Sequence, residues 1–290
     1  GKNSLFSELG SRYLVVKDSY DGLSGVAVPA SGMAVPVEAQ NAYGLEQETW
    51  LEDGLLTSDA TWRVLGSSVS ITSMILGLKS TGVANTSDAL KATPLNNDFY
   101  LNADQWDGFG RYRKEKLIPM LQPTAVSTNG AISISGDIHS SWVSRHGNNG
   151  DVYSFTCPSI SSGTFKSLIS DQADTLVKSL SGGQPNDELS AAKDQLMGLL
   201  DNIVKQSSAL QSDAEKISNG EIEYNKMDVH GFAVAEVDSS GFVCKFHQMN
   251  PVRNDVDLVK NDLYSRQKTV LDAFYEEGFR VEDGSLVRIA

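Results

Sequence analysis

Alternation of apolar and polar residues predicts several β-strands along the chain. The clearest case is a hairpin, in which strands over 231–237 and 241–247 are joined by a turn at Asp238 to Gly241. The same alternation, or a short apolar run bounded by turn residues, predicts further strands over 12–17, 62–71, 131–137, 152–157 and 285–289. The segments 21–42 and 77–101 are predicted to be a loop and a polar connection.

Residues 165–219 differ from their surroundings because their apolar residues recur at helical spacing. Ser181 to Gly183 separate two such stretches, which predicts an antiparallel helical hairpin. Its function is open between a lid or packing insert and a docking surface through which the protein forms an oligomer. Shorter helices are predicted over 44–56, 110–121 and 265–277, the last ending at Gly278.

Composition and charge narrow the class of protein. The 290 residues are 40% hydrophobic and 21% charged, as in ordinary globular domains, and no run approaches the roughly 20 apolar residues that cross a membrane. The sequence shows no signal peptide either. The net charge of -13, without a cluster of lysines and arginines, argues against a nucleic-acid partner and otherwise favours solubility.

One segment carries candidate chemistry, namely Ser133 to Trp142, SISGDIHSSW. Side chains two apart in a strand share a face, so Asp137 and His139 are expected to point the same way at a strand end. A carboxylate and an imidazole suit a hard or borderline metal ion. An Asp-x-His pair also occurs in hydrogen-bonded loops and as a satisfied core histidine, so the pair alone leaves these alternatives open.

Several segments together resemble the PhoD-like alkaline phosphatases and phosphodiesterases, a family of calcineurin-like metallophosphoesterases. The resemblance covers most of residues 10–250. It rests on the segments GLEQETWL (44–51), SDATWRVLGSSV (58–69), NADQWDGFGRYR (102–113), SISGDIHSSW (133–142), TCPSISS (156–162) and HGFAVAEV (230–237).

The resemblance implies an α/β fold, a layered sheet sandwich flanked by helices. Residues 1–164 and 220–290 are expected to form the second half of the catalytic domain, and 165–219 a helical insertion. The family's early metal ligand, its Gly-Asp-x-x-Tyr segment and its Trp-Asp-Asp-His-Glu segment have no counterpart in the sequence. We therefore expect an N-terminal fragment of the same precursor to complete the active site. The resemblance also implies a periplasmic or extracellular location.

By the same resemblance, the expected activity is metal-dependent hydrolysis of phosphate mono- or diesters. Two ions about 4 Å apart activate a water in such sites. Asp137 and His139 would each bind one ion, with His139 as the catalytic residue and with Fe, Ca, Zn or Mn as possible metals. Further candidates for binding the substrate or supporting the ligands are Ser140, Ser141, Trp106, Asp107, Arg111 and His230.

Some of these candidates have simpler interpretations. Trp106 and Asp107 can form an aromatic plug with a capping carboxylate, and Arg111 and Arg113 can face solvent on their helix. His146 and His247 are expected at surface or strand positions. Cys157 and Cys244 can pair if their strands are neighbours, or remain buried thiols.

The chain departs from the family's pattern at three places. It has Asp18, Ser19 and Tyr20 where relatives carry Asp-Thr-Arg, and Ser67 and Ser68 where they carry Asn-Gln. It has Asn219, Gly220 and Glu221 where they often carry Asn-Pro-His. These departures favour an alternative, in which the protein is an exported surface or assembly protein on an inactive phosphatase fold.

Overall fold

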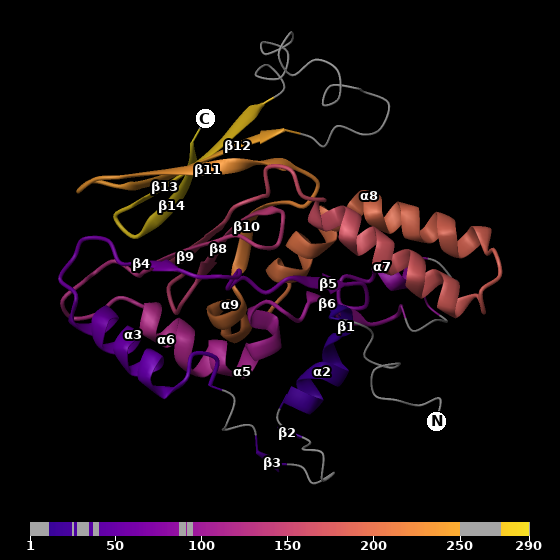
Figure 1. The fold of residues 1–290 in the computed structure, drawn as a ribbon, viewed down its shortest axis with the longest axis horizontal. Helices are drawn as coiled ribbons and strands as arrows, with labels where there is room; N and C mark the ends of the chain where they lie inside the picture. Colours follow the sequence, from indigo (N-terminus) through magenta and orange to yellow (C-terminus); the bar gives the residue numbers. More distant parts are fainter. Residues whose placement is uncertain are drawn as a thin grey trace.

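A five-stranded sheet lies at the centre of the molecule (Figure 1). The computed structural model describes residues 12–24, 26–27, 35–36, 41–86, 91, 95–249 and 274–289. In sheet order the five strands are β10 (Glu221–Lys226), β8 (Ser141–His146), β9 (Val152–Thr156), β7 (Ile132–Ser135) and β4 (Val64–Gly66). Since β4, β7 and β9 run parallel, their carboxyl ends lie at the same edge of the sheet.

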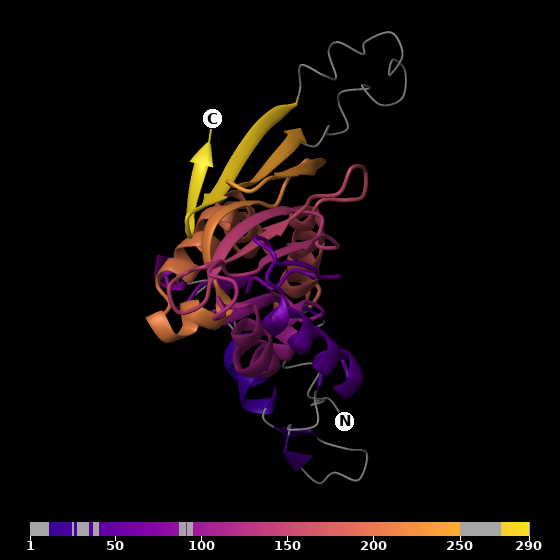
Figure 2. The ribbon, with the colours of Figure 1, turned by 90° about the vertical axis from the view of Figure 1, so that its left-hand side faces the viewer.

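An antiparallel four-stranded sheet covers one face of the central sheet (Figure 2). Apolar side chains from both sheets, including Ile132, Phe155 and Phe246, form the core between them. The predicted hairpin is confirmed, because the first two strands pair along their whole length. In order, the strands are β11 (His230–Val237), β12 (Phe242–Met249), β13 (Tyr275–Glu282) and β14 (Ser285–Ile289).

The helix predicted over 265–277 is wrong at its end. Tyr275 to Glu277 belong to β13, which hydrogen-bonds to β12 on one side and to β14 on the other. Gly278 therefore lies inside a strand, and an added Cβ there would be 2.7 Å from the Ile289 side chain. Residues 265–273 lie outside the described residues.

Helices cover the other face of the central sheet. Leu65 and Ala131 of the sheet side pack against Leu55, Ile118 and Leu121 from these helices. The helix predicted over 110–121 is confirmed as one continuous helical stretch. The elements on this face are α3 (Leu45–Thr57), η3 (Trp106–Phe109), α5 (Gly110–Tyr112), η4 (Arg113–Leu117) and α6 (Ile118–Leu121).

The predicted strand over 62–71 is shorter than expected. Only Val64–Gly66 pair with β7, and the chain then passes beneath the sheet as a buried segment from Ser70 to Met74. Polar side chains in this segment bond to polar groups under the sheet instead of continuing the ladder, for example Thr72 Oγ1 to Ser144 Oγ at 2.6 Å. This polar layer leads towards the edge at which β7 ends.

The predicted helical hairpin is confirmed: α7 (Phe165–Leu180) and α8 (Asp187–Ala209) lie side by side and are followed by α9 (Asp213–Asn219) (Figure 1). Their apolar faces pack on a small sheet of order β1-β6-β5. Part of that sheet lies where a polar connection was expected. Its strands are β1 (Tyr13–Val16), β5 (Ile75–Gly77) and β6 (Asp98–Asn102).

The remaining elements are short. They are α2 (Lys17–Ser24), within the N-terminal part expected to be strand and loop, β2 (Val26–Ala27), β3 (Val35–Pro36) and η2 (Val83–Thr86). The α/β fold class, with layered sheets flanked by helices, is confirmed. No helix among the described residues is long and apolar enough to cross a membrane.

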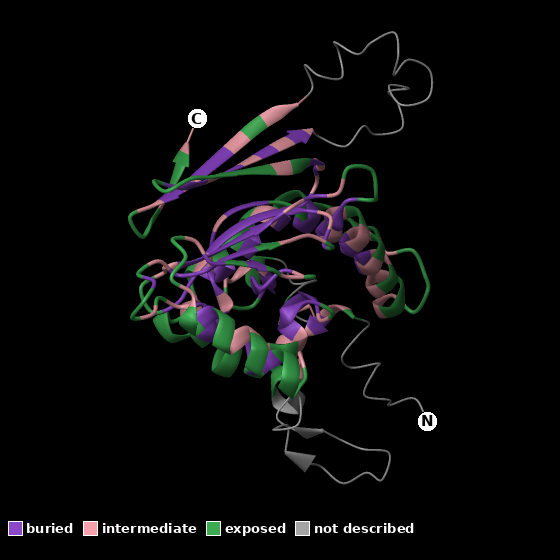
Figure 3. Cartoon of the chain, turned by 60° about the vertical axis from the view of Figure 1, so that its left-hand side comes forward, coloured by how far each residue is buried: buried purple, intermediate pink, exposed green. Residues whose placement is uncertain are grey.

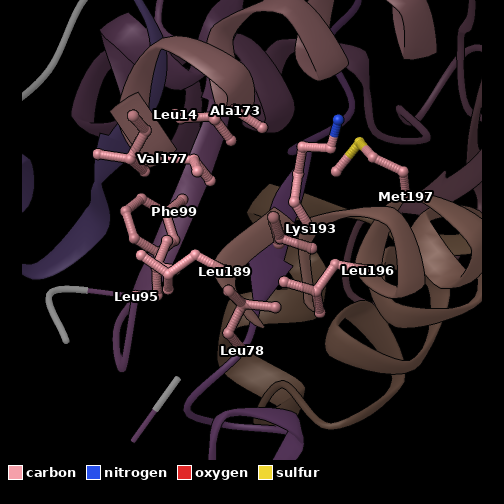
Figure 4. A pocket seen from close by; sticks show the side chains of 12 residues that line it. Leu14, Leu78, Leu95, Phe99, Ala173, Val177, Leu189, Lys193, Leu196 and Met197 are labelled. Atoms are coloured by element: carbon pink, nitrogen blue, oxygen red, sulfur yellow. The ribbon is translucent and has the colours of Figure 1, made fainter. Parts of the chain in front are cut away.

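An apolar cavity lies between the helical hairpin and the small sheet (Figure 4). Leu78, Phe99, Val177 and Leu196 are among its lining side chains, and Lys193 reaches it from α8. The Lys193 ammonium is paired with Asp174 at 2.8 Å and with Asp194 at 3.0 Å. No candidate site residue lines this cavity, so it is separate from the end of β7.

Candidate metal centre at the end of β7

Asp137 and His139 lie in the bend that follows β7, not in the strand itself. Both have left-handed backbones, with φ of 70° and 53°, and Ile138 between them is buried. A left-handed backbone at a non-glycine residue costs about 1–2 kcal/mol, and such strain clusters at functional sites. The strand alternation from which a shared orientation was expected does not apply in this bend. Asp137 is exposed, His139 is half-buried and Ile138 is buried.

A main-chain carbonyl fixes the imidazole of His139. Its Nδ1 lies 2.7 Å from the carbonyl oxygen of Gly163, in the loop that precedes α7. A carbonyl oxygen only accepts hydrogen bonds, so Nδ1 carries the proton in the neutral ring and Nε2 keeps its lone pair. The N–H of Phe165 donates to the His139 carbonyl at 3.1 Å, which ties the same bend to the start of α7.

A buried amide supports the Asp137 carboxylate. Gln105 Nε2 donates to Asp137 Oδ2 at 2.8 Å, and the N–H of Ser70 donates to Gln105 Oε1 at 2.9 Å. Gln105 and Ser70 are both fully buried. Gln105 was not among the predicted site residues, although it immediately precedes Trp106. Gly163 contributes only a carbonyl, for which the sequence carries no signal.

Hydroxyl groups continue this polar layer beneath the sheet. Thr156 Oγ1 on β9 donates to Ser70 Oγ at 2.9 Å and lies 3.0 Å from Ser135 Oγ on β7. Farther from the sheet edge, Ser144 Oγ lies 2.9 Å from Nε2 of the buried His146. The bend after β7 therefore rests on a hydrogen-bonded interior.

Trp106 and Asp107 lie in the interior, which supports the plug-and-cap interpretation. Asp107 accepts from Ser73 Oγ at 2.6 Å and from the N–H of Met74 at 2.9 Å. The indole of Trp106 stacks on Tyr112, with ring centroids 6.0 Å apart.

Arg113 does not face solvent, as one interpretation of its helix had it. Its side chain is 1% exposed and donates to Asp107 at 2.9 Å. Arg111 is exposed and pairs with Glu115 at 3.0 Å. Ser140 and Ser141 are buried, and their hydroxyl oxygens accept from Trp142 and Gln248. Of these residues, Arg111 alone has a guanidinium within reach of solvent.

Two other positions are linked to segments around the bend. The N–H of Gly231, next to His230, donates to the carbonyl of Ser159 at 3.0 Å, in the loop that also holds Gly163. The N–H of Ser67 donates to the Ile134 carbonyl at 2.9 Å, so Ser67 and Ser68 lie at the carboxyl end of β4 beside the end of β7. One of the departures from the family pattern therefore falls at the candidate site.

The donor set fits part of a metal centre. Asp137 Oδ1 and His139 Nε2 are oxygen and nitrogen donors of the kind that Fe, Zn and Mn accept. Within the described ranges, however, no group of three or more His, Cys, Asp or Glu side chains is arranged to hold an ion. Cys157 and Cys244 are free thiols. At this bend the described residues thus offer one carboxylate and one imidazole as candidate donors.

Comparison with known proteins places these features in a family. A family model described as PhoD-like phosphatase matches residues 19–242. A solved structure entitled "Structure of PhoD" is similar, with a TM-score of 0.44 and 16% sequence identity, over 85% of this chain and 35% of that chain. The chain thus spans about a third of the length of that structure. No curated protein matches significantly. Because the family model covers more than half of the chain, the chain belongs to the PhoD-like phosphatase family.

Proposed function

We propose that this chain takes part in metal-dependent hydrolysis of phosphate mono- or diesters. In this proposal Asp137 and His139 are metal ligands at the end of β7. The observation that carries the proposal is the 2.7 Å contact between His139 Nδ1 and the Gly163 carbonyl. It leaves Nε2 as an oriented donor, since ligating histidines usually give their other N–H to a carbonyl or carboxylate.

The Asp137 carboxylate would serve as the second donor. One oxygen accepts from Gln105, so the other remains available to a cation. When bound, a pair of divalent or trivalent ions lowers the pKa of a water between them and stabilises charge on the phosphoryl oxygens. Fe, Zn, Mn and Ca remain possible, because a carboxylate and an imidazole do not distinguish them.

We further propose that an N-terminal portion of the same precursor supplies the remaining ligands. The open edge of the central sheet supports this. Val64 and Ile134 point to the face that packs against the second sheet, yet they are 45% and 39% exposed. β11, at the edge of the second sheet, is exposed along most of its length (Figure 3). A strand added parallel to β4 would extend the sheet beside Val64, and its carboxyl end would lie at the same edge of the sheet as the end of β7.

Charge supports ions as the attractive element for the substrate. The net charge of -13 repels phosphate at long range, so bound cations would supply most of the local positive charge. Arg111 is exposed and can add to it, although it is paired with Glu115. By family membership, we also propose a periplasmic or extracellular location.

Metal content and hydrolysis, measured together, test the proposal. The protein is purified with any polypeptide that accompanies it, its metals are measured by elemental analysis, and it is assayed with p-nitrophenyl phosphate and bis(p-nitrophenyl) phosphate. Asp137→Asn removes one anionic ligand. Asp283→Asn is the matched control, because Asp283 is also an exposed aspartate with a left-handed backbone, φ 47°, in the β13–β14 turn.

We expect stoichiometric metal and hydrolysis in the wild type and in Asp283→Asn, and loss of both in Asp137→Asn. Equal metal content and activity in the two variants would overturn the role of Asp137. A well-folded, metal-free and inactive wild-type complex would overturn the proposed activity and would favour the surface or assembly protein on an inactive fold.

A further inference from the structure

Gln105 connects the interior of the protein to the exposed Asp137. It lies directly before η3 and is fully buried. Both ends of its side-chain amide are bonded, to the N–H of Ser70 at 2.9 Å and to Asp137 Oδ2 at 2.8 Å. A buried amide with these two partners links a main-chain donor under the sheet to a carboxylate at the surface.

The orientation of this amide follows from its partners. The Ser70 N–H can only donate, so the amide oxygen must face it, and the amide nitrogen must then face Asp137. Ser70 is itself held by Thr156 Oγ1 at 2.9 Å, on the strand next to β7. Gln105 is thus fixed relative to the sheet edge that bears Asp137.

We infer that Gln105 is a positioning residue that holds the Asp137 carboxylate ready for a metal ion. This inference rests on the proposed function. An exposed aspartate in a left-handed bend would otherwise sample several rotamers. The entropic cost of ordering its side chain when an ion binds would then weaken ion binding. A neutral donor at Oδ2 restricts those rotamers and leaves the negative charge of the carboxylate in place. A lysine or an arginine at the same position would neutralise that charge.

The contrast with Asp107 supports this assignment. Asp107 is buried and paired with the cationic Arg113, so its charge is already compensated. Asp137 has a neutral amide as its partner and an exposed side chain. Both aspartates are held by hydrogen bonds, but the surroundings of Asp137 leave its negative charge available to a cation.

Mn²⁺ binding tests this inference without the need for activity. The probe is Mn²⁺ alone, titrated into the protein together with any accompanying polypeptide, and free Mn²⁺ is measured by electron paramagnetic resonance. Gln105→Met removes the donor, and Gln105→Asn keeps an amide that is too short to span both partners. We expect both variants to bind Mn²⁺ about 10- to 100-fold more weakly, the usual effect of removing a group that orients a ligand.

Gln248→Met is the matched control. Gln248 is a fully buried glutamine that donates to Ser141 Oγ at 2.6 Å and accepts from Tyr224 at 2.8 Å. The Gln248→Met variant should lose about as much stability as Gln105→Met. Its affinity for Mn²⁺ should nevertheless stay within about twofold of wild type, a change far smaller than that expected when a ligand-orienting group is removed. Thermal unfolding shows whether each variant is folded at the titration temperature.

The outcomes separate the inference from the proposed function. If Asp137→Asn loses Mn²⁺ while both Gln105 variants bind as wild type does, the inference is wrong and the proposed ligand stands. If Gln248→Met is weakened as much as Gln105→Met, the effect is general destabilisation and the inference is also wrong. If Asp137→Asn binds Mn²⁺ as tightly as wild type does, Asp137 is not a metal ligand, and both the proposed site and the inference about Gln105 are wrong.

Discussion

The guanidinium of Arg113 and the carboxylate of Asp107 lie 2.9 Å apart in the interior, where neither side chain is more than 1% exposed. Arg113 also donates to Asn219 Oδ1 at 2.7 Å, at the end of α9. Asp107 accepts from Ser73 and from the N–H of Met74. This pair therefore joins the helix over 110–121 to α9 and to the buried segment beneath the sheet.

Removing one partner of this pair should be strongly destabilising. Asp107→Asn leaves the Arg113 charge buried without a counter-ion, which typically costs about 3–5 kcal/mol. Urea denaturation would measure the change in the free energy of unfolding. Glu115→Gln is the control, because its exposed pair with Arg111 is worth at most about 0.5 kcal/mol. A similar small change in both variants would contradict a structural role for the buried pair.

His146 should make stability depend on pH. Burial, with a contribution from the nearby Arg113 charge, lowers the pKa of His146 to about 3. In the unfolded chain the pKa is about 6.5, so between these values only the unfolded state takes up the proton. His146 therefore does not reduce stability above about pH 6.5. Below that pH, the free energy of unfolding falls by about 1.4 kcal/mol per pH unit as the pH drops towards 3.

His146→Gln removes the titrating group and should flatten this part of the profile. The measurement is urea denaturation of wild type and variant at pH 7 and pH 5, where the wild type should lose about 2 kcal/mol more than the variant. Comparing the two proteins at each pH cancels the contributions of carboxylates. An equal loss in both would mean that His146 takes up its proton in the folded state as well.

Gly220, between α9 and β10, should not tolerate a side chain. Its φ is +89°, and a Cβ would lie 2.5 Å from the buried His146 ring. Gly44→Ala provides the comparison, since Gly44 has φ +79° but no atom within 4 Å of an added Cβ. We expect Gly44→Ala to cost about 1 kcal/mol and Gly220→Ala about 1–3 kcal/mol more, by thermal or urea unfolding. Equal costs would exclude the ring contact as a cause.

The two cysteines should react slowly as free thiols. Burial, with the neighbouring Cys157, raises the pKa of Cys244 to about 12, and burial also raises the pKa of the half-buried Cys157. At pH 8 the Cys244 thiolate is therefore scarce, and thiolate is the reactive form. With Ellman's reagent and no reductant, native protein should show one slow and one much slower thiol, and denatured protein two fast ones.

Cys157→Ser and Cys244→Ser assign the two phases. The slow phase should disappear in Cys157→Ser, and the much slower one in Cys244→Ser. If the denatured, unreduced protein showed no reactive thiol, the cysteines would form a disulfide, which the sequence had left open.

Local patterns predicted the elements whose signal lies within the segment. The helical spacing within 165–219 predicted α7 and α8, and the alternation over 231–247 predicted β11 and β12. In β12 buried and half-buried residues alternate along its whole length, because one face packs on the central sheet. These patterns record which face is buried, so they can be read without knowing the partner.

Elements whose conformation depends on distant partners were predicted poorly. β13 has a glycine and several glutamates, yet it forms a strand because β12 and β14 provide ladders on both of its sides. β6 lies almost wholly in the region 77–101, which was predicted to be a polar connection, and it forms a strand because it pairs with β1 and β5. Arg113 was expected to face solvent on its helix, but Asp107 and Asn219 surround its guanidinium inside the protein.

The sequence by itself determined the candidate ligands and their family. The Gly-Asp-Ile-His segment specified a carboxylate and an imidazole two residues apart, since the identity of a donor atom is a property of the residue. The tertiary structure alone decided how those donors are held, because Gln105 lies 32 positions from Asp137, and Gly163 lies 24 positions from His139. Hydrogen bonds of that separation exist only once the sheet and the loops around it have packed, so no local pattern specifies them.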